Sequence, residues 1–145
     1  SPAFLERNDL MGALHGSCFC GAVAYEVDAL GPIGHCHCKT CQKTHSAAFA
    51  TTARASRAGF RWTKGADVVA GIESTPGKTR HFCPKCGTHM MAEWHDQDAV
   101  IVRVGSLDSP VPSKPVVHIW TSHKADFFDF EDGLPRLPEA FPKPA

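Results

Sequence analysis

The segment Cys83-Pro84-Lys85-Cys86-Gly87 carries the pattern on which the fold prediction rests. Its two cysteines, separated by a proline and a lysine, are typical of a tight turn that offers both sulfurs to one metal ion. The glycine that follows can adopt the positive φ with which such a turn ends. Backbone N–H groups of the turn can donate to the sulfurs and spread their negative charge. The segment therefore predicts one half of a tetrahedral metal site.

The remaining five cysteines lie in two groups, Cys18-Phe19-Cys20 and Cys36-His37-Cys38-Lys39-Thr40-Cys41. In an extended strand, residues two apart face the same side, so a Cys-x-Cys pair can present two sulfurs to one ion. Seven cysteines cannot all pair as disulfides within one chain. Tetrahedral sites made only of thiolates favour zinc or iron, and zinc is the ion that we expect.

Two divisions of the seven sulfurs into a four-sulfur site and a three-sulfur site are open. A zinc-ribbon arrangement joins Cys38 and Cys41 to the pair in segment 83–87. The other arrangement joins the pair in segment 18–20 to the pair in segment 83–87 and leaves the triplet in segment 36–41 as a second site. We favour the second arrangement because the triplet is self-contained, although spacing alone does not fix the partition.

The triplet is the candidate catalytic site, because catalytic zinc keeps three protein ligands and one exchangeable position whereas structural zinc is closed. A nearby His35, His37 or His45 could supply a fourth ligand and make this site structural as well. On a strand His37 points away from the metal, whereas His45 would share the face of Cys41 on a continuing helix. We predict catalytic roles for His37 and His45, since histidine can carry protons near neutral pH.

Composition excludes several classes of protein. The 145 residues are 43% hydrophobic, which supports a real core, and 15 basic side chains balance 15 acidic ones. A net charge of zero argues against a nucleic-acid partner. No run approaches the roughly 18 apolar residues that a membrane span needs, so we expect no membrane partner. The N-terminal residues lack a signal pattern, so we expect a cytoplasmic protein whose thiols stay reduced.

Short strands separated by turns predict a mainly β domain over residues 14–138. Residues 1–13 are predicted as a flexible arm and residues 139–145 as a proline-rich tail. A short helix is expected over residues 39–45. The predicted strands are residues 22–27, 47–53, 60–63, 67–72, 79–82, 99–104 and 116–121.

Three phenylalanines lie close together near the end of the chain, at Phe127, Phe128 and Phe130. Such a group is more typical of a hydrophobic docking surface than of a ligand cage. We therefore predict a docking strip over these residues.

Read together, six runs resemble the glutathione-dependent formaldehyde-activating enzyme family, which also contains the centromere protein V domain. The resemblance extends from Leu14 to Pro138. The chain departs from the family pattern at His45, which precedes Ser46 where the family usually has a Gly-Ser or Gly-Ala pair. The matching runs are residues 16–25, 36–43, 74–87, 105–108, 115–119 and 132–135.

The resemblance implies a β-tent fold of antiparallel sheets, pinned by a four-cysteine zinc, and a second zinc with an open position. It implies an enzyme similar to a zinc-dependent carbon–sulfur lyase, which adds a thiol to a small aldehyde such as formaldehyde or catalyses the reverse. Glutathione is the candidate co-substrate. The alternative is a non-catalytic zinc module with a structural or protein-interaction role. By this resemblance the first zinc is held by Cys18, Cys20, Cys83 and Cys86, and the second by Cys36, Cys38 and Cys41.

Overall fold

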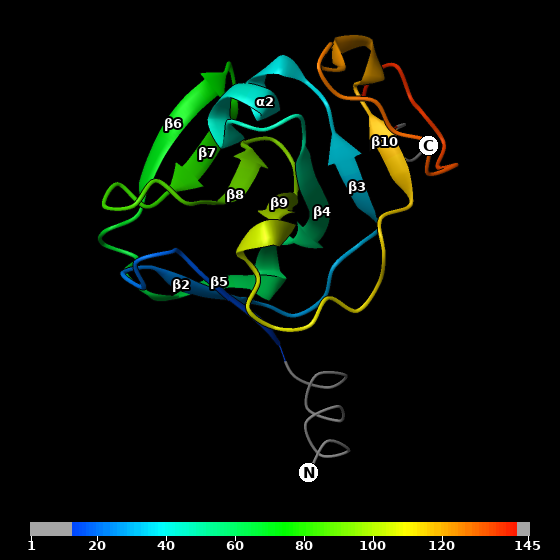
Figure 1. Cartoon of the computed structure of the whole chain (residues 1–145). Helices are drawn as coiled ribbons and strands as arrows, with labels where there is room; N and C mark the ends of the chain where they lie inside the picture. Colours follow the sequence, from blue (N-terminus) through cyan, green and yellow to red (C-terminus); the bar gives the residue numbers. More distant parts are fainter. Residues whose placement is uncertain (1–12, 142–145) are drawn as a thin grey trace. The chain divides into compact units, whose positions relative to one another are not determined.

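A computed structural model of the chain describes residues 13–141, which fold into ten strands, one α-helix and three short 3-10 helices (Figure 1). This confirms the mainly β class. The described residues divide into two compact units, residues 13–31 with 53–112 and residues 32–52 with 113–141. Most of the predicted arm and tail lies outside the described residues, and the single domain over residues 14–138 stays a prediction. Within the described part of the chain, no helix is long and apolar enough to cross a membrane.

The first unit contains a small antiparallel sheet in the order β1-β2-β5. Strand β1 spans Leu14–Ser17, β2 spans Ala24–Val27 and β5 spans Phe60–Lys64. Tyr25 on the central strand pairs with Gly16 on one side and with Trp62 on the other. Because β1 and β2 are joined by a short turn, the residues of that turn are held at one end of the sheet.

The same unit contains a row of strands in the order β9-β8-β7-β6, and the end of β4 lies beside β9 (Figure 1). Strands β6 to β9 are antiparallel neighbours, so β7 and β8 form a hairpin whose turn carries a Cys-x-x-Cys segment. Strand β4 begins in the second unit and ends in the first. The bounds are Ala50–Ser56 for β4, Ala70–Thr75 for β6, Lys78–Phe82 for β7, His89–Trp94 for β8 and Ala99–Arg103 for β9.

The core of the first unit includes two cysteine side chains. Cys18 and Cys83 are buried at 4% and 0% exposure within the same apolar cluster as the side chains of β1, β2, β8 and β9. Tyr25 and Val27 on β2 and Val100 and Val102 on β9 alternate and so point to one side, whereas β8 contributes the neighbouring residues Met90 and Met91. The other buried members of the cluster are Leu14, Val23, Tyr25, Val27, Ala55, Met90, Met91, Val100 and Val102.

The second unit is built on two parallel strands and one helix. Strand β3 (Ile33–Cys36) pairs with β10 (Val117–Ile119), and helix α2 (Lys39–His45) follows β3 after two residues. The helix has the predicted bounds. A 3-10 helix, η3 (Thr121–His123), follows β10, and the final described segment returns to donate and accept backbone bonds with residues 118–122. The C-terminal segment is therefore part of this unit.

All seven predicted strands overlap observed ones, and four of their ends match, at Val27, Phe60, Phe82 and Ala99, but three other strands were not predicted. The expected strand start at residue 67 is wrong, because Val68 and Val69 both donate to the Gly65 carbonyl in a turn, at 2.8 and 3.0 Å. The unpredicted strands are β1, β3 and β8. Strands β1 and β3 each contain a glycine, and β8 contains two methionines and an alanine, so neighbouring strands rather than local propensity hold them.

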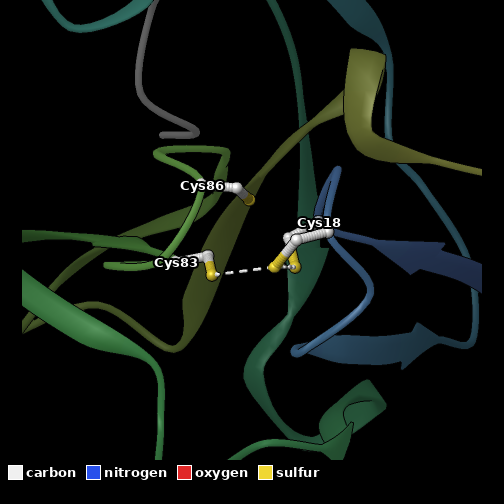
Figure 2. Close-up of side chains that lie close together, drawn as sticks. Cys18, Cys83 and Cys86 are labelled. Carbon is white, nitrogen blue, oxygen red and sulfur yellow. Dashed lines mark hydrogen bonds between the residues drawn. The ribbon is translucent and has the colours of Figure 1, made fainter.

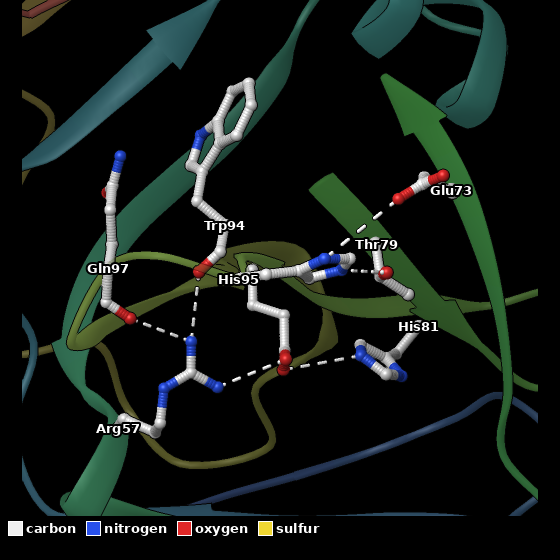
Figure 3. A network of polar contacts seen from close by, with 8 residues as sticks. Arg57, Glu73, Thr79, His81, Trp94, His95 and Gln97 are labelled. Carbon is white, nitrogen blue, oxygen red and sulfur yellow. Dashed lines mark hydrogen bonds and ion pairs between the residues drawn. The ribbon is translucent and has the colours of Figure 1, made fainter. Parts of the chain in front are cut away.

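A polar network ties the end of β4 to strand β8 in the first unit (Figure 3). The guanidinium of Arg57, in the 3-10 helix η1 (Arg57–Gly59), donates to Glu93 at 3.1 Å. It also donates to the carbonyl oxygens of Trp94 and Gln97, at 3.1 and 2.9 Å. Glu93 lies 3.4 Å from His81, whose pKa is lowered by burial although the carboxylate opposes this effect. The network fixes the hairpin that presents Cys83.

The tyrosine of β2 closes a buried hydrogen-bond chain in the same unit. Tyr25 is 1% exposed and lies 2.6 Å from Ser106 Oγ. Ser106 in turn donates to the Arg103 carbonyl at 2.7 Å, so Tyr25 is the donor in its own bond. Burial raises the pKa of Tyr25 to about 12, and Asp108 adds to the rise while the bond to Ser106 opposes it.

We expect Tyr25→Phe to lower the free energy of unfolding by about 1 kcal/mol at neutral pH, because one buried hydrogen bond is lost. The unfolded chain ionises at about pH 10, so the contribution of Tyr25 is complete below that pH. It is lost as the pH rises from about 10 towards 12, because the folded state holds the proton more tightly. Denaturant unfolding at several pH values measures both effects.

Tyr25 is the only tyrosine in the sequence, so phenolate absorbance follows its ionisation directly. Serine at position 106 provides the comparison, because Ser106→Ala removes the acceptor and leaves the tyrosine in place. A wild-type phenol that ionises like free tyrosine in the folded protein would contradict this prediction.

Candidate metal centres

Four cysteine sulfurs meet between two turns of the first unit. Cys18 and Cys20 lie in the turn between β1 and β2, and Cys83 and Cys86 lie in the turn between β7 and β8. Figure 2 shows the side chains of Cys18, Cys83 and Cys86 close together. Cys20 Sγ is 3.7 Å from Cys18 Sγ and 3.8 Å from Cys83 Sγ. All four sulfurs lie within 4.8 Å of one another. The structure thus brings together the four residues that the favoured partition groups.

The turn at Cys83 has the backbone that its sequence predicts. Gly87 has a φ of 84°, as expected, and its N–H donates to the Cys83 carbonyl at 2.7 Å. The Val23 N–H lies 3.3 Å from Cys18 Sγ, as a donor to sulfur. The Thr88 hydroxyl, 3.3 Å from Cys86 Sγ, together with the Thr88 backbone lowers the pKa of the Cys86 thiol to about 5. These donors favour thiolates, the form that binds metals.

The second cluster is carried by one short segment of the second unit. Cys36 ends β3, Cys38 is the N-cap of α2 and Cys41 lies in the first turn of that helix. Cys41 Sγ is 3.4 Å from Cys36 Sγ, and the Cys41 N–H donates to Cys38 Sγ at 3.3 Å. Ile119 and Trp120 pack against this cluster. The local turn from strand to helix therefore suffices to gather the three sulfurs.

Both clusters fit a tetrahedral zinc ion. Two sulfurs at about 2.3 Å from such an ion lie about 3.8 Å apart. The observed separations of 3.4 to 3.8 Å are close to that value and far longer than a disulfide bond. Hydrogen bonds with the sulfurs of Cys38 and Cys41 are the main cause that raises the pKa of the Cys36 thiol, and burial and the repulsion between neighbouring thiolates add to the rise. A cation at the centre would relieve that repulsion, so the donor chemistry fits a metal ion.

No histidine joins the three sulfurs within residues 13–141. His45 is the last residue of α2 and is partly exposed. His37 is fully buried at 0% exposure, and burial lowers the pKa of its ring to about 4, with His118 adding to this effect. His35 bonds to the Thr51 hydroxyl at 2.9 Å. The catalytic roles of His37 and His45 stay predictions.

Two residues near the triplet, His118 and Asp132, were given no role from the sequence. His118 Nδ1 lies 2.8 Å from His37 Nε2, and His118 Nε2 lies 2.7 Å from an Asp132 carboxylate oxygen. The Phe130 ring stacks on His118 at a centroid distance of 3.8 Å. The docking strip is therefore wrong for Phe130, although Phe127 is 76% exposed. The sequence signal that could have pointed to His118 was a histidine within the otherwise apolar strand β10.

The sequence pattern of the GFA family, described as glutathione-dependent formaldehyde-activating enzyme, matches residues 13–123 and so includes both clusters. The chain belongs to this family. It is similar to a protein of Halomonas elongata that is provisionally named as a glutathione-dependent formaldehyde-activating enzyme, with 29% identity over 140 residues and 81% of each chain covered. A crystal structure of a Rhodobacter sphaeroides protein from structural genomics has a similar fold, with a TM-score of 0.60 and 22% identity. That likeness covers 85% of this chain and 99% of the other.

We expect the purified protein to hold two zinc ions per chain and each cluster to lose its own ion when one cysteine is replaced. Cys83→Ser should lose one ion and several kcal/mol of stability, because its cluster joins two hairpins through the core. Cys41→Ser should lose the other ion with a smaller change in stability, because its three sulfurs are already local in sequence. Elemental analysis and thermal unfolding measure these effects.

All seven cysteines belong to the two clusters, so the matched control comes from another residue of α2. Thr44→Ser keeps the hydroxyl that bonds to the Thr40 carbonyl and should retain both ions. Two ions in Cys41→Ser would show that the triplet is not a separate metal site.

Proposed function

We propose that this chain is a zinc enzyme that adds a glutathione-type thiol to a small aldehyde such as formaldehyde, or catalyses the reverse. The four-cysteine cluster is the closed, structural zinc site of a β-tent, and the triplet holds the catalytic zinc. The activity is that of a carbon–sulfur lyase. The seven free cysteines suit a reducing compartment such as the cytoplasm.

The single observation that supports this proposal is the number of sulfurs in the second cluster. Three side chains offer sulfur, and within the described residues no histidine or carboxylate joins them. Three protein ligands with one exchangeable position are typical of catalytic zinc. The membership of the GFA family supplies the substrate class, a thiol and formaldehyde.

A zinc ion held by three thiolates would supply a position at which a substrate thiol has a lowered pKa. The protein's own residues determine the rest of the site. Cys38 caps helix α2, and Cys41 lies one turn further along the same helix, so the helix fixes two of the three sulfurs. Trp120 packs beside them with a left-handed backbone, at φ 55°. We propose that its indole forms a wall of the substrate site.

In the reaction the thiol sulfur forms a bond to the carbonyl carbon, and the carbonyl oxygen takes up the proton that the thiol gives up. We propose that His45 carries this proton. It lies four residues after Cys41 in α2, and the residue as a whole is only partly buried, in contrast to His37. His37 is fully buried and cannot exchange directly. The reverse reaction moves the same proton back as the carbon–sulfur bond breaks.

We expect zinc-loaded protein to accelerate the exchange between formaldehyde, glutathione and their hydroxymethyl adduct, measured by NMR at equilibrium. Cys41→Ser should abolish the acceleration because it removes a metal ligand. His45→Gln should keep both ions and reduce kcat by about 100-fold, the usual contribution of a general acid–base group.

Lys43→Gln, which changes an exposed residue on the same helix, is the control and should leave the rate unchanged. If the protein holds both zinc ions but does not accelerate the reaction over its spontaneous rate, the proposed enzymatic activity is excluded. It would then favour a zinc module with a structural or protein-interaction role.

A further inference from the structure

Beside the triplet, a hydrogen-bond chain runs from the surface to a fully buried ring. Asp132, with a side chain 41% exposed, accepts from His118 at 2.7 Å, and His118 meets His37 at 2.8 Å. His118 and His37 are 1% and 0% exposed. The chain ends at His37 Nδ1, a buried atom that has no hydrogen-bond partner within the described residues.

The carboxylate of Asp132 determines which nitrogen of each histidine in this chain carries a proton. A carboxylate only accepts, so His118 Nε2 carries a proton, and the other nitrogen of a neutral His118 ring is then an acceptor. His37 Nε2 must donate to it. His37 Nδ1 therefore holds a lone pair, which explains why a buried ring nitrogen can lie without an acceptor.

The His37 ring is held tightly by its surroundings. Phe130 stacks on both imidazoles, at centroid distances of 3.8 Å to His118 and 5.0 Å to His37. The Arg136 guanidinium lies over the Phe130 ring, 4.1 Å from its centre. Phe49 lies 5.2 Å from His37. A ring enclosed by aromatic groups can move only if these neighbours move.

The backbone of His37 is held as well, and it lies between two of the three sulfurs. Its N–H donates to the Ile119 carbonyl at 2.9 Å, and its carbonyl accepts from the Gln42 side chain at 2.8 Å. Because Cys36 and Cys38 are its chain neighbours, a shift of His37 displaces the sulfurs on both sides.

We propose that Asp132, acting through His118, fixes His37 as its Nε2–H tautomer and thereby positions Cys36 and Cys38 for the metal ion. These are positioning residues and do not touch substrate. The inference rests on the proposed function only in taking the triplet as a metal site. Its test needs no substrate, so its failure is distinguishable from failure of the proposed enzyme.

Asp132→Asn gives a sharp test because the two carboxylate oxygens have different partners. One accepts from the Leu134 N–H at 3.1 Å, which is a fixed backbone donor, and the other accepts from His118. An asparagine that keeps the first bond presents its NH₂ group to His118 Nε2. His118 must then carry its proton on Nδ1, and His37 must carry its proton on Nδ1 instead of Nε2.

The experiment measures histidine tautomers by long-range ¹H–¹⁵N NMR of the zinc-loaded full chain, together with zinc release to a chelator. Wild type should show an unprotonated His37 Nδ1, and Asp132→Asn should show this nitrogen protonated. Zinc should leave the triplet at least about tenfold faster in the variant, as for other losses of a group that orients metal ligands. Zinc in the four-cysteine cluster should leave at the wild-type rate and serves as the internal reference.

Asp129→Asn is the matched control, since this carboxylate is 90% exposed in the same segment and pairs with Lys124 at 2.9 Å. It should change neither the tautomers nor zinc release. A wild-type His37 with its proton on Nδ1, or equal zinc release in wild type and Asp132→Asn, would overturn the proposal. If Asp132→Asn does not fold, the tautomer of His37 in the wild-type protein still tests the proposal. A doubly protonated His118 would donate from Nδ1 to His37 Nε2, and the His37 proton would then lie on Nδ1.

Discussion

The close approach of sulfur atoms is the constraint on which the structure depends. In the first unit, two turns bring the sulfurs of Cys20 and Cys83, which are 63 positions apart in the sequence, to 3.8 Å from each other. Thiolates at this distance repel one another unless a cation neutralises them. Cys18 and Cys83 are also members of the hydrophobic core. The packing of the first unit and the geometry of its cluster are therefore coupled, and a change in one disturbs the other.

The two clusters use the same donor atom in different settings. The four-cysteine cluster draws on two hairpins and shares the core, which suits a structural role. The triplet lies within six residues at a junction between a strand and a helix, and Ala50, Ile119 and Trp120 pack around it. Three sulfurs leave a metal ion with less charge compensation and one fewer ligand. The proposed division into a structural and a catalytic cluster rests on this difference in number and setting, since both clusters offer the same type of ligand.

Much of this arrangement could be predicted from short motifs. The positive φ of Gly87, the helix over residues 39–45 and the grouping of the cysteines all follow from local spacing or from the family resemblance. Strand β8 could not be predicted, because its methionines and alanine favour a helix in isolation and only pairing with β7 and β9 makes it a strand. The role of Phe130 was also misjudged, since an aromatic side chain does not reveal from sequence which ring it will contact.

The sequence by itself determined that cysteine sulfurs would form the candidate metal centres of this protein, because the spacing of the cysteines limits which sulfurs one turn can present. Only the tertiary structure decided what surrounds the triplet. His37 and His118 are 81 positions apart in the chain, yet their side chains and that of Asp132 form one line of hydrogen bonds. That alignment depends on the parallel pairing of β3 with β10 and on the return of the C-terminal segment. Both are contacts between segments far apart in the sequence. The free energy that favours them comes from tertiary packing, which short sequence motifs do not reveal.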